Sequence, residues 1–176
     1  MDLYDLSVSG LRIEIVKRAD GAGMLRCTRA DGSVSSQKQA KYAAHFALHD
    51  LTHFAVETVL GCRRAFFGLI AEGWDIEDTI GKGARGPLPE EAIQVERIVG
   101  LFDVERASGV QSNAGEFSAN TGRTMTDDEL HRIRELRAEL FVKWAAVAPS
   151  TALELEFAPK VYQGDCAKRS AARSSS

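Results

Sequence analysis

The sequence lacks the features that would place it in several large protein classes. Its 176 residues contain no run of about 18 apolar residues and no basic start followed by an apolar stretch, so we expect neither a membrane span nor a signal peptide. The 22 basic and 25 acidic residues nearly balance, which gives no electrostatic signature of nucleic-acid binding. These absences predict a soluble, cytoplasmic protein that works without a membrane or nucleic-acid partner.

Cysteine is scarce as well. Cys27, Cys62 and Cys166 are widely spaced and form no CxxC pair, which argues against a disulfide framework and against a thiolate zinc site. Cys62 precedes Arg63 and Arg64, whose charges would lower the pKa of its thiol. No base partner for a nucleophilic thiol is evident, so we expect three reduced thiols without a catalytic role.

A 44% apolar content is enough for a single core, and we expect one globular domain over residues 1–163. The Ala-, Lys-, Arg- and Ser-rich stretch 164–176 has little to bury and is expected to be a disordered tail. Alternating apolar and polar residues predict strands at 11–17, 24–28 and 152–157, while residues 34–36 fit either a third strand or the approach to a helix.

About four helices are expected where apolar residues recur at helical spacing: 42–60, 65–74, 89–108 and 126–148. The glycine- and proline-rich stretch 75–89 and the polar stretch 110–125 are expected to be loops. The sequence therefore predicts an α+β fold. Its small antiparallel sheet, an N-terminal hairpin plus a C-terminal strand, would pack against the helices.

Three of the four histidines fall on the helix expected at 42–60. Four-residue steps place the following side chains on one slowly turning stripe, at about 0, 40, 80 and 120° around the helix axis: His45, His49, His53 and Glu57. Asp50 adds a second carboxylate at about 140°. The helix contains no Lys, Arg, Gln, Asn or Ser, the residues that usually cover a solvated face, so the stripe indicates chemistry.

Side chains four residues apart on a helix are about 5–6 Å apart at Cβ, so two imidazoles can bind the same divalent ion. We predict that His49 and His53 form that pair, with His45 or Glu57 as a third ligand or an orienting partner. Such ligands favour Zn²⁺, and Fe²⁺, Mn²⁺ and Ni²⁺ are compatible with them. Because histidine binds metal only when neutral, the affinity should fall steeply below about pH 6.

Two interpretations without a metal stay open for the same stripe. Its imidazoles and carboxylates could form a buried hydrogen-bond network that binds a small polar ligand, or a purely structural polar seam. The remaining histidine, His131, lies about 160° from the apolar centre of its own expected helix and should face water. Asp103, Glu105 and Arg106 are likewise expected to be solvated.

The five residues His49-Asp50-Leu51-Thr52-His53 resemble the HExxH helix motif of the zincin metallohydrolases, with Asp in place of Glu. The resemblance implies that His49 and His53 are zinc ligands and that Asp50, one methylene shorter than glutamate, stands at the position of the general base. In the gluzincin branch the third ligand is a glutamate on a later helix, for which Glu91 or Glu96 is the nearest equivalent.

The sequence therefore predicts a metal-binding protein, with a small metal-dependent hydrolase as the first interpretation and Asp50 or Glu57 as the catalytic carboxylate. The alternative is a non-enzymatic protein that holds a metal ion or small ligand in the same histidine cleft. Lys82, Arg85 and Trp74 are candidates for contacting a small-molecule or peptide substrate, and the aromatic segment around Trp74 could support a homodimer.

Overall fold

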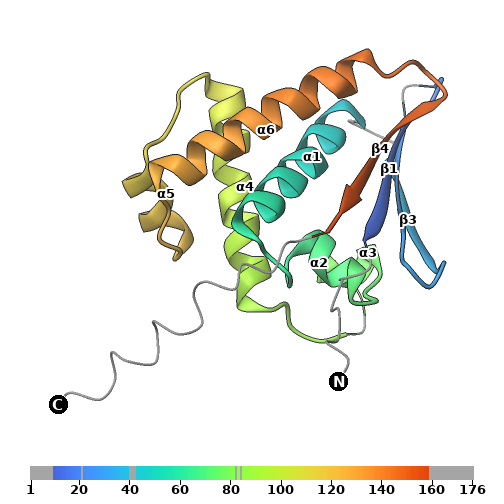
Figure 1. The fold of residues 1–176 in the computed structure, drawn as a ribbon, viewed down its shortest axis with the longest axis horizontal. Helices are drawn as coiled ribbons and strands as arrows, with labels where there is room; N and C mark the ends of the chain where they lie inside the picture. Colours follow the sequence, from blue (N-terminus) through green and yellow to red (C-terminus); the bar gives the residue numbers. More distant parts are fainter. Residues whose placement is uncertain (1–9, 21, 40–42, 82, 84, 159–176) are drawn as a thin grey trace, which may run out of the picture.

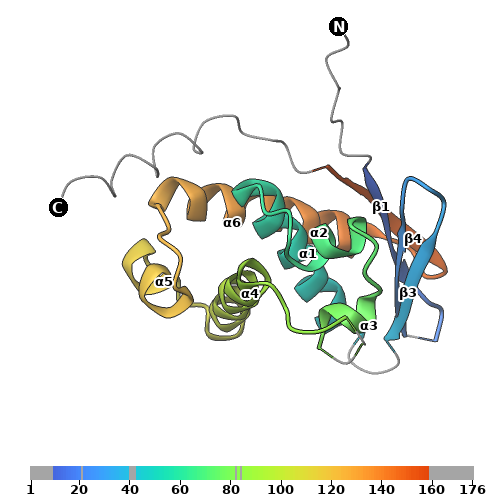
Figure 2. The same cartoon turned by 90° about the horizontal axis from the view of Figure 1, so that it is seen from below.

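One antiparallel sheet and six helices make up the part of the chain that the structure describes. The computed structural model describes residues 10–20, 22–39, 43–81, 83 and 85–158. Figure 1 shows the strands gathered at one end of the molecule, and Figure 2 shows the helices on one side of the sheet. The predicted α+β class is confirmed.

The sheet has the order β3-β2-β1-β4, and every neighbouring pair is antiparallel. Its strands are β1 (Leu11–Lys17), β2 (Gly23–Thr28), β3 (Val34–Gln39) and β4 (Thr151–Phe157). In β1, one of the two inner strands, Ile13 lies opposite Cys27 of β2 and Leu155 of β4. Alternate residues of β1 point to opposite faces, so Ile13 is buried towards the helices while Arg12 and Glu14 form ion pairs on the outer face.

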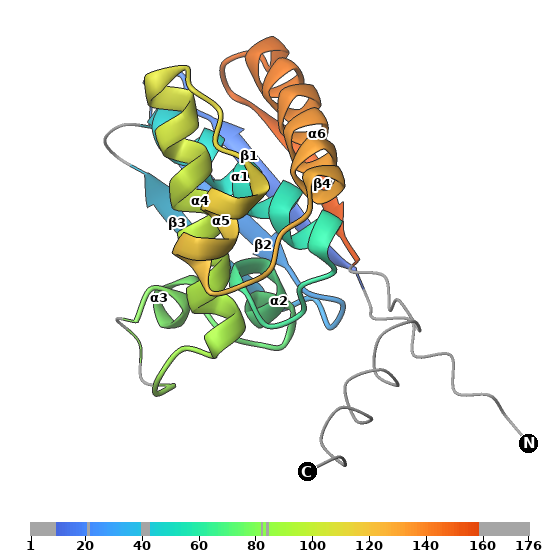
Figure 3. The same ribbon diagram turned by 90° about the vertical axis from the view of Figure 1, so that its left-hand side faces the viewer.

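The helices are α1 (Ala43–Leu60), α2 (Phe66–Ala71), α3 (Ile76–Thr79), α4 (Glu90–Ser108), α5 (Ala114–Thr121) and α6 (Asp127–Ala146). Helix α1 contacts the sheet through β2 and also packs on α2, α4 and α6; Figure 3 shows it behind and between α4 and α6. Residues 51–57 of α1 are all buried. The absence of long solvated side chains from this helix therefore reflects burial on nearly all sides, and its polar residues must find partners inside the protein.

Aromatic side chains join α1, α2 and the sheet at the centre of the core. The ring of Phe54 on α1 lies 6.3 Å from that of Phe67 on α2 and 6.1 Å from that of Phe157 on β4, and the last two are 5.9 Å apart. Tilted and edge-on contacts of this kind stabilise a core beyond the area they bury. They fix α2 close to the middle of α1, where the histidines are.

The structure corrects two local expectations and decides between the two alternatives left open at residues 34–36. The stretch 110–125, expected to be a loop, contains α5, which begins at a capping box formed by Asn113 and Glu116 and ends at Gly122 in the left-handed conformation, with φ of 73°. The short helix α3 lies within the predicted loop at 75–89, so the helices number six where about four were expected. Residues 34–39 form a full strand. Helices of four and eight residues are too short for apolar periodicity to reveal them.

The predicted tail at 164–176 lies outside the described residues, as does the end of the domain predicted at residue 163. Within the described ranges, the helices are all too short or too polar to cross a bilayer.

Candidate metal centre

Helices α1 and α4 bring two imidazoles and one carboxylate together. His49 and His53 stand one turn apart on α1, and Glu96 projects from α4, which packs against α1. One ring nitrogen of each histidine and one carboxylate oxygen of Glu96 all lie within 4.8 Å of one another. The three residues form a group that could hold a metal ion.

His49 is oriented by a carboxylate from α4. Its Nδ1 lies 2.8 Å from Oδ2 of Asp103, which leaves Nε2 as the other ring nitrogen. Partial burial would raise the pKa of Asp103, but the contact with His49, together with Arg106, outweighs that effect and lowers it. An ionised carboxylate on Nδ1 fixes the ring and its tautomer, the usual arrangement behind a metal-binding histidine.

His53 is almost fully buried between two carboxylates. Its Nδ1 lies 3.4 Å from Oε1 of Glu57, and its Nε2 lies 3.4 Å from Oε1 of Glu96. Burial alone would lower the pKa of His53, but the facing carboxylates raise it to about 10. The facing carboxylates therefore favour the protonated ring in the metal-free protein, although Nδ1 makes no hydrogen bond with the described residues. A metal ion at Nε2 would bind in place of the proton there.

Glu57 has a structural partner as well as His53. Its carboxylate accepts hydrogen bonds from the backbone N–H groups of Phe67, at 3.0 Å, and Gly68, at 3.1 Å, in the first turn of α2. These amides have no partner inside their own helix, and a fully buried carboxylate satisfies them. A Cβ at Gly68 would collide with the backbone of Arg63, so glycine is required where the start of α2 packs against that backbone.

His45 lies further along the stripe and faces solvent. Its Nδ1 is 3.0 Å from Nη2 of Arg106, and its ring stacks at 6.2 Å from the ring of His49. Neither His45 nor Glu57 belongs to the group of potential ligand atoms. The sequence left the third residue open between His45, Glu57 and a residue of a later helix; among the described residues, Glu96 is the one that lies within reach of both His49 and His53.

Asp50 is buried on the same helix and has an amide partner. Its Oδ2 accepts a hydrogen bond of 2.8 Å from Nε2 of Gln39, the last residue of β3. Burial raises the pKa of Asp50 to about 6, against the opposing influence of Gln39, His53 and His49. The charges of both histidines act on this carboxylate, and one hydrogen bond holds it. It can therefore still accept a proton or a further hydrogen bond.

Two carboxylates of α4 complete the cluster, and sequence reasoning identified their roles only in part. Glu96 was named through the zincin resemblance alone, and Asp103 was expected to be solvated. Seven residues separate them, about two helical turns, so both lie on one face of α4. The seven-residue spacing of Glu96 and Asp103, considered together with the histidine stripe of α1, was the sequence feature that could have identified both carboxylates. Glu91, the other glutamate that the resemblance suggested, instead accepts hydrogen bonds from the backbone of Arg63 and Arg64.

The predicted substrate residues are not joined to the cluster by any contact among the described residues. Arg85 donates a hydrogen bond to the backbone carbonyl of Gly73 at 2.8 Å, and its guanidinium lies 5.9 Å from the ring of Trp74. Trp74 packs in a small cluster with Leu69. Lys82, the third candidate, lies outside the described residues.

The remaining histidine and the cysteine near α1 take no part in the cluster. His131 is exposed, as predicted, and lies 3.3 Å from Glu135 one turn further along α6. Cys62 is buried, and burial raises the pKa of its thiol to about 12, which excludes the activated thiolate that its arginine neighbours suggested.

No protein-family model, curated protein or solved structure matches this chain. The assignment of the centre therefore depends on its own geometry and chemistry.

Proposed function

We propose that this protein binds one divalent metal ion through His49, His53 and Glu96. The observation that carries the proposal is the grouping of their ligand atoms within 4.8 Å. It is supported by the carboxylates beside the rings: Asp103 contacts Nδ1 of His49 and Glu57 lies 3.4 Å from Nδ1 of His53, so the Nε2 atoms are left to bind a metal ion.

Zinc is the first choice of metal because two imidazoles and one carboxylate are a common zinc ligand set. The same set accepts Fe²⁺, Mn²⁺ or Ni²⁺. Three protein ligands leave a coordination position open, which is the usual property of a catalytic rather than a structural zinc site. The Glu96 side chain is 43% exposed, so the cluster is accessible from solvent on that side.

We infer that the reaction is a hydrolysis. A bound zinc ion would act as a Lewis acid and make water a stronger nucleophile near neutral pH. Asp50 would accept the proton from that water or hold a ligand in place, because burial raises its pKa to about 6, close to neutral pH. Glu57 keeps His53 and α2 in position. The substrate would be a small molecule or a peptide.

Metal analysis of untagged protein tests the binding step. The protein is stripped with chelator, reloaded with zinc and dialysed, and its metal content is measured by mass spectrometry. We expect one ion per chain in the wild type and in the His131→Ala control, whose histidine is exposed on α6. The His49→Ala/His53→Ala double variant should retain none. Substoichiometric metal in replete wild type, or full metal in the double variant, would refute the site.

Two single variants test the ligand assignment in the same assay. Glu96→Gln removes a charged ligand and should weaken zinc binding by more than the about 10–100-fold expected when Asp103→Asn removes an outer partner. Glu139→Gln, an exposed glutamate on α6, is the matched control and should bind like wild type. Equal affinities for Glu96→Gln and Glu139→Gln would remove Glu96 from the site.

The hydrolase step needs its own measurement. Zinc-loaded protein is assayed against panels of peptides, esters, amides and phosphate esters beside the metal-free protein. We expect one class to be hydrolysed only by the loaded form, and Asp50→Asn to reduce that rate. A loaded protein that hydrolyses nothing above the metal-free control would leave the non-enzymatic metal-binding protein as the function.

A further inference from the structure

Residues at the carboxyl end of α4 and on α6 line a hollow outside the metal-binding cluster. Its volume is about 370 Å³, and three arginines line it, Arg106, Arg134 and Arg137, together with one acidic residue, Glu105. The carboxyl end of a helix carries partial negative charge, which accounts for part of this positive charge. The partners of each guanidinium show how much of this positive charge remains unbalanced.

Two of the three arginines have carboxylate partners. Nη2 of Arg134 lies 2.6 Å from Oε1 of Glu105 and also donates to the backbone carbonyl of Ser112 at 2.6 Å. Nη2 of Arg106 lies 3.3 Å from Oδ1 of Asp103. Each of these ion pairs is close to neutral, so neither arginine alone calls for a ligand.

Arg137 is different, because no carboxylate of the described residues forms an ion pair with it. Its Nε donates to Oγ1 of Thr52 and its Nη2 to the backbone carbonyl of Phe102, both at 3.2 Å. Its guanidinium lies 4.7 Å from the ring of Phe102 and 5.2 Å from that of Phe141. Arg137 is only 7% exposed, and Glu105 and Asp103 act on its charge only from a distance, so its burial without a direct ion pair is costly to the fold.

The planar guanidinium favours one class of counter-ion. Arginine binds carboxylates and phosphates through parallel N–H groups, and the aromatic rings beside Arg137 hold its plane fixed. Nη1 of Arg137 makes no hydrogen bond with the described residues, so this donor is available at the wall of the hollow. Arg106 and Arg134 line the same space, but Asp103 and Glu105 largely balance their charges, which leaves Arg137 as the principal cation.

We propose that this hollow binds an oxyanion, the carboxylate or phosphate group of a small ligand, with Arg137 as its principal partner. The site does not depend on the metal. It borders the metal centre through Arg106, whose Nη2 lies 3.0 Å from Nδ1 of His45 and whose Asp103 partner orients His49. An anionic group held there would therefore lie beside the exposed end of the histidine stripe.

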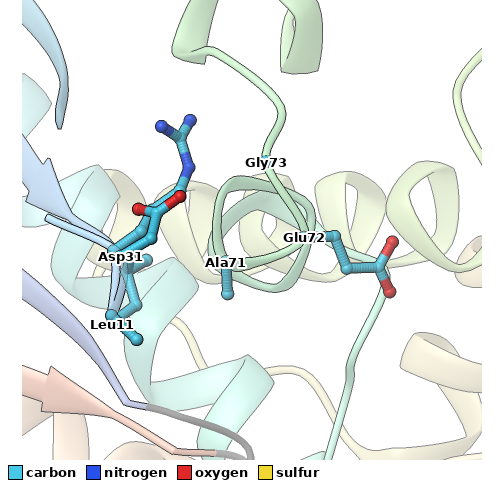
Figure 4. A pocket seen from close by; sticks show the side chains of 7 residues that line it. Leu11, Asp31, Ala71, Glu72 and Gly73 are labelled. Carbon is cyan, nitrogen blue, oxygen red and sulfur yellow. The ribbon is translucent and has the colours of Figure 1, made fainter. Parts of the chain in front are cut away.

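The hollow shown in Figure 4 provides a contrast. It also contains an arginine, Arg29, and lies between β1, the turn after β2 and the end of α2. That guanidinium donates to the backbone carbonyls of Ile70 and Trp74, at 2.7 and 2.5 Å. Asp31 and Glu72 share the lining, so the hollow of Figure 4 carries no excess positive charge.

Nuclear magnetic resonance of the arginine Nε–Hε groups tests the proposal on metal-free protein, which separates it from the metal assignment. Inorganic phosphate and succinate are titrated separately, with chloride holding the ionic strength constant. We expect the Arg137 and Arg106 resonances to move saturably with one of the two probes, which identifies the oxyanion. The resonance of Arg132, exposed on α6, should not move.

Variants extend the same titration. Arg137→Gln should weaken binding of the effective probe about tenfold or more, the loss of one charge-assisted hydrogen bond, while Arg132→Gln should leave it unchanged. If Arg137→Gln does not fold, Arg106→Gln, at a 29% exposed side chain, should weaken the same binding. Failure of both probes to give a saturable shift, or equal weakening by Arg132→Gln, would show that the arginines only brace the helices.

Discussion

Replacing Glu57 by alanine tests whether this carboxylate stabilises the cluster through its contacts with His53 and α2 or acts as a metal ligand. Glu57 is fully buried, accepts hydrogen bonds from the amides of Phe67 and Gly68, and faces the protonated ring of His53. The Glu57→Ala variant leaves the amides without an acceptor and the imidazolium with Glu96 alone. All of these groups are then buried without their main partner.

The expected cost is large for a single substitution. Leaving a buried donor unsatisfied costs about 1–3 kcal/mol, and removing one member of a buried ion pair costs about 3–5 kcal/mol. These contributions overlap, so we expect the free energy of unfolding of Glu57→Ala to fall by about 3–5 kcal/mol. For a chain of this size that corresponds to a melting temperature lower by about 10 °C. Glu57→Gln keeps one acceptor oxygen and should lose about half as much.

The assay is urea unfolding of metal-free protein, followed by circular dichroism, with Glu139→Ala as the exposed control. A loss below about 1 kcal/mol for Glu57→Ala, similar to that of Glu139→Ala, would contradict the role assigned to Glu57. Zinc titration of Glu57→Gln adds a second criterion. We expect the affinity to fall about 10–100-fold, as for an outer partner, and complete loss of binding by a folded variant would instead make Glu57 a ligand.

Two further predictions follow from the pKa values. Facing carboxylates raise the pKa of His53 to about 10 in the metal-free protein, and the ring must be neutral to bind zinc. At pH 8, zinc binding should therefore release about one proton from His53. For the same reason, the zinc affinity should keep rising as the pH is raised above 6. Calorimetry in buffers of different ionisation enthalpy measures the release, and enthalpies independent of the buffer would contradict it. Burial raises the pKa of Cys27 and of Cys62 to about 12. Neither thiol should therefore react with a thiol reagent at pH 8 until the protein is denatured. Rapid labelling of either thiol in the native protein would show that the core is open to the reagent at that residue.

Much of the fold follows from local patterns. The period-two alternation at 11–17 and 152–157 identified β1 and β4, and long stretches of helical spacing identified α1, α4 and α6. The two helices that were missed, α3 and α5, have 4 and 8 residues and begin at capping boxes. A helix of one or two turns depends on its cap and on contacts made after folding, and neither gives a periodic signal.

In the candidate metal centre, the contributions of sequence and of tertiary structure differ more clearly. The four-residue spacing of His49 and His53 determined that both imidazoles would project from one face of α1, because helical geometry is local. The sequence also supplied Glu57 and Asp50 on the same helix. It could not rank the carboxylates, because the intrinsic pKa values of aspartate and glutamate differ little and their surroundings, which the sequence does not show, shift them by more.

The packing of α4 and α2 against α1 determines which carboxylates lie next to the histidines. Contact with α4 placed Glu96 at Nε2 of His53 and Asp103 at Nδ1 of His49, while the first turn of α2 took the carboxylate of Glu57 as acceptor for its free amides. These partners are separated from the histidines by up to 54 residues of sequence. The sequence by itself determined where the imidazoles would stand on their helix. Only the tertiary structure decided which carboxylates meet them, because burial and distance, not residue type, set the charge and the role of each acid.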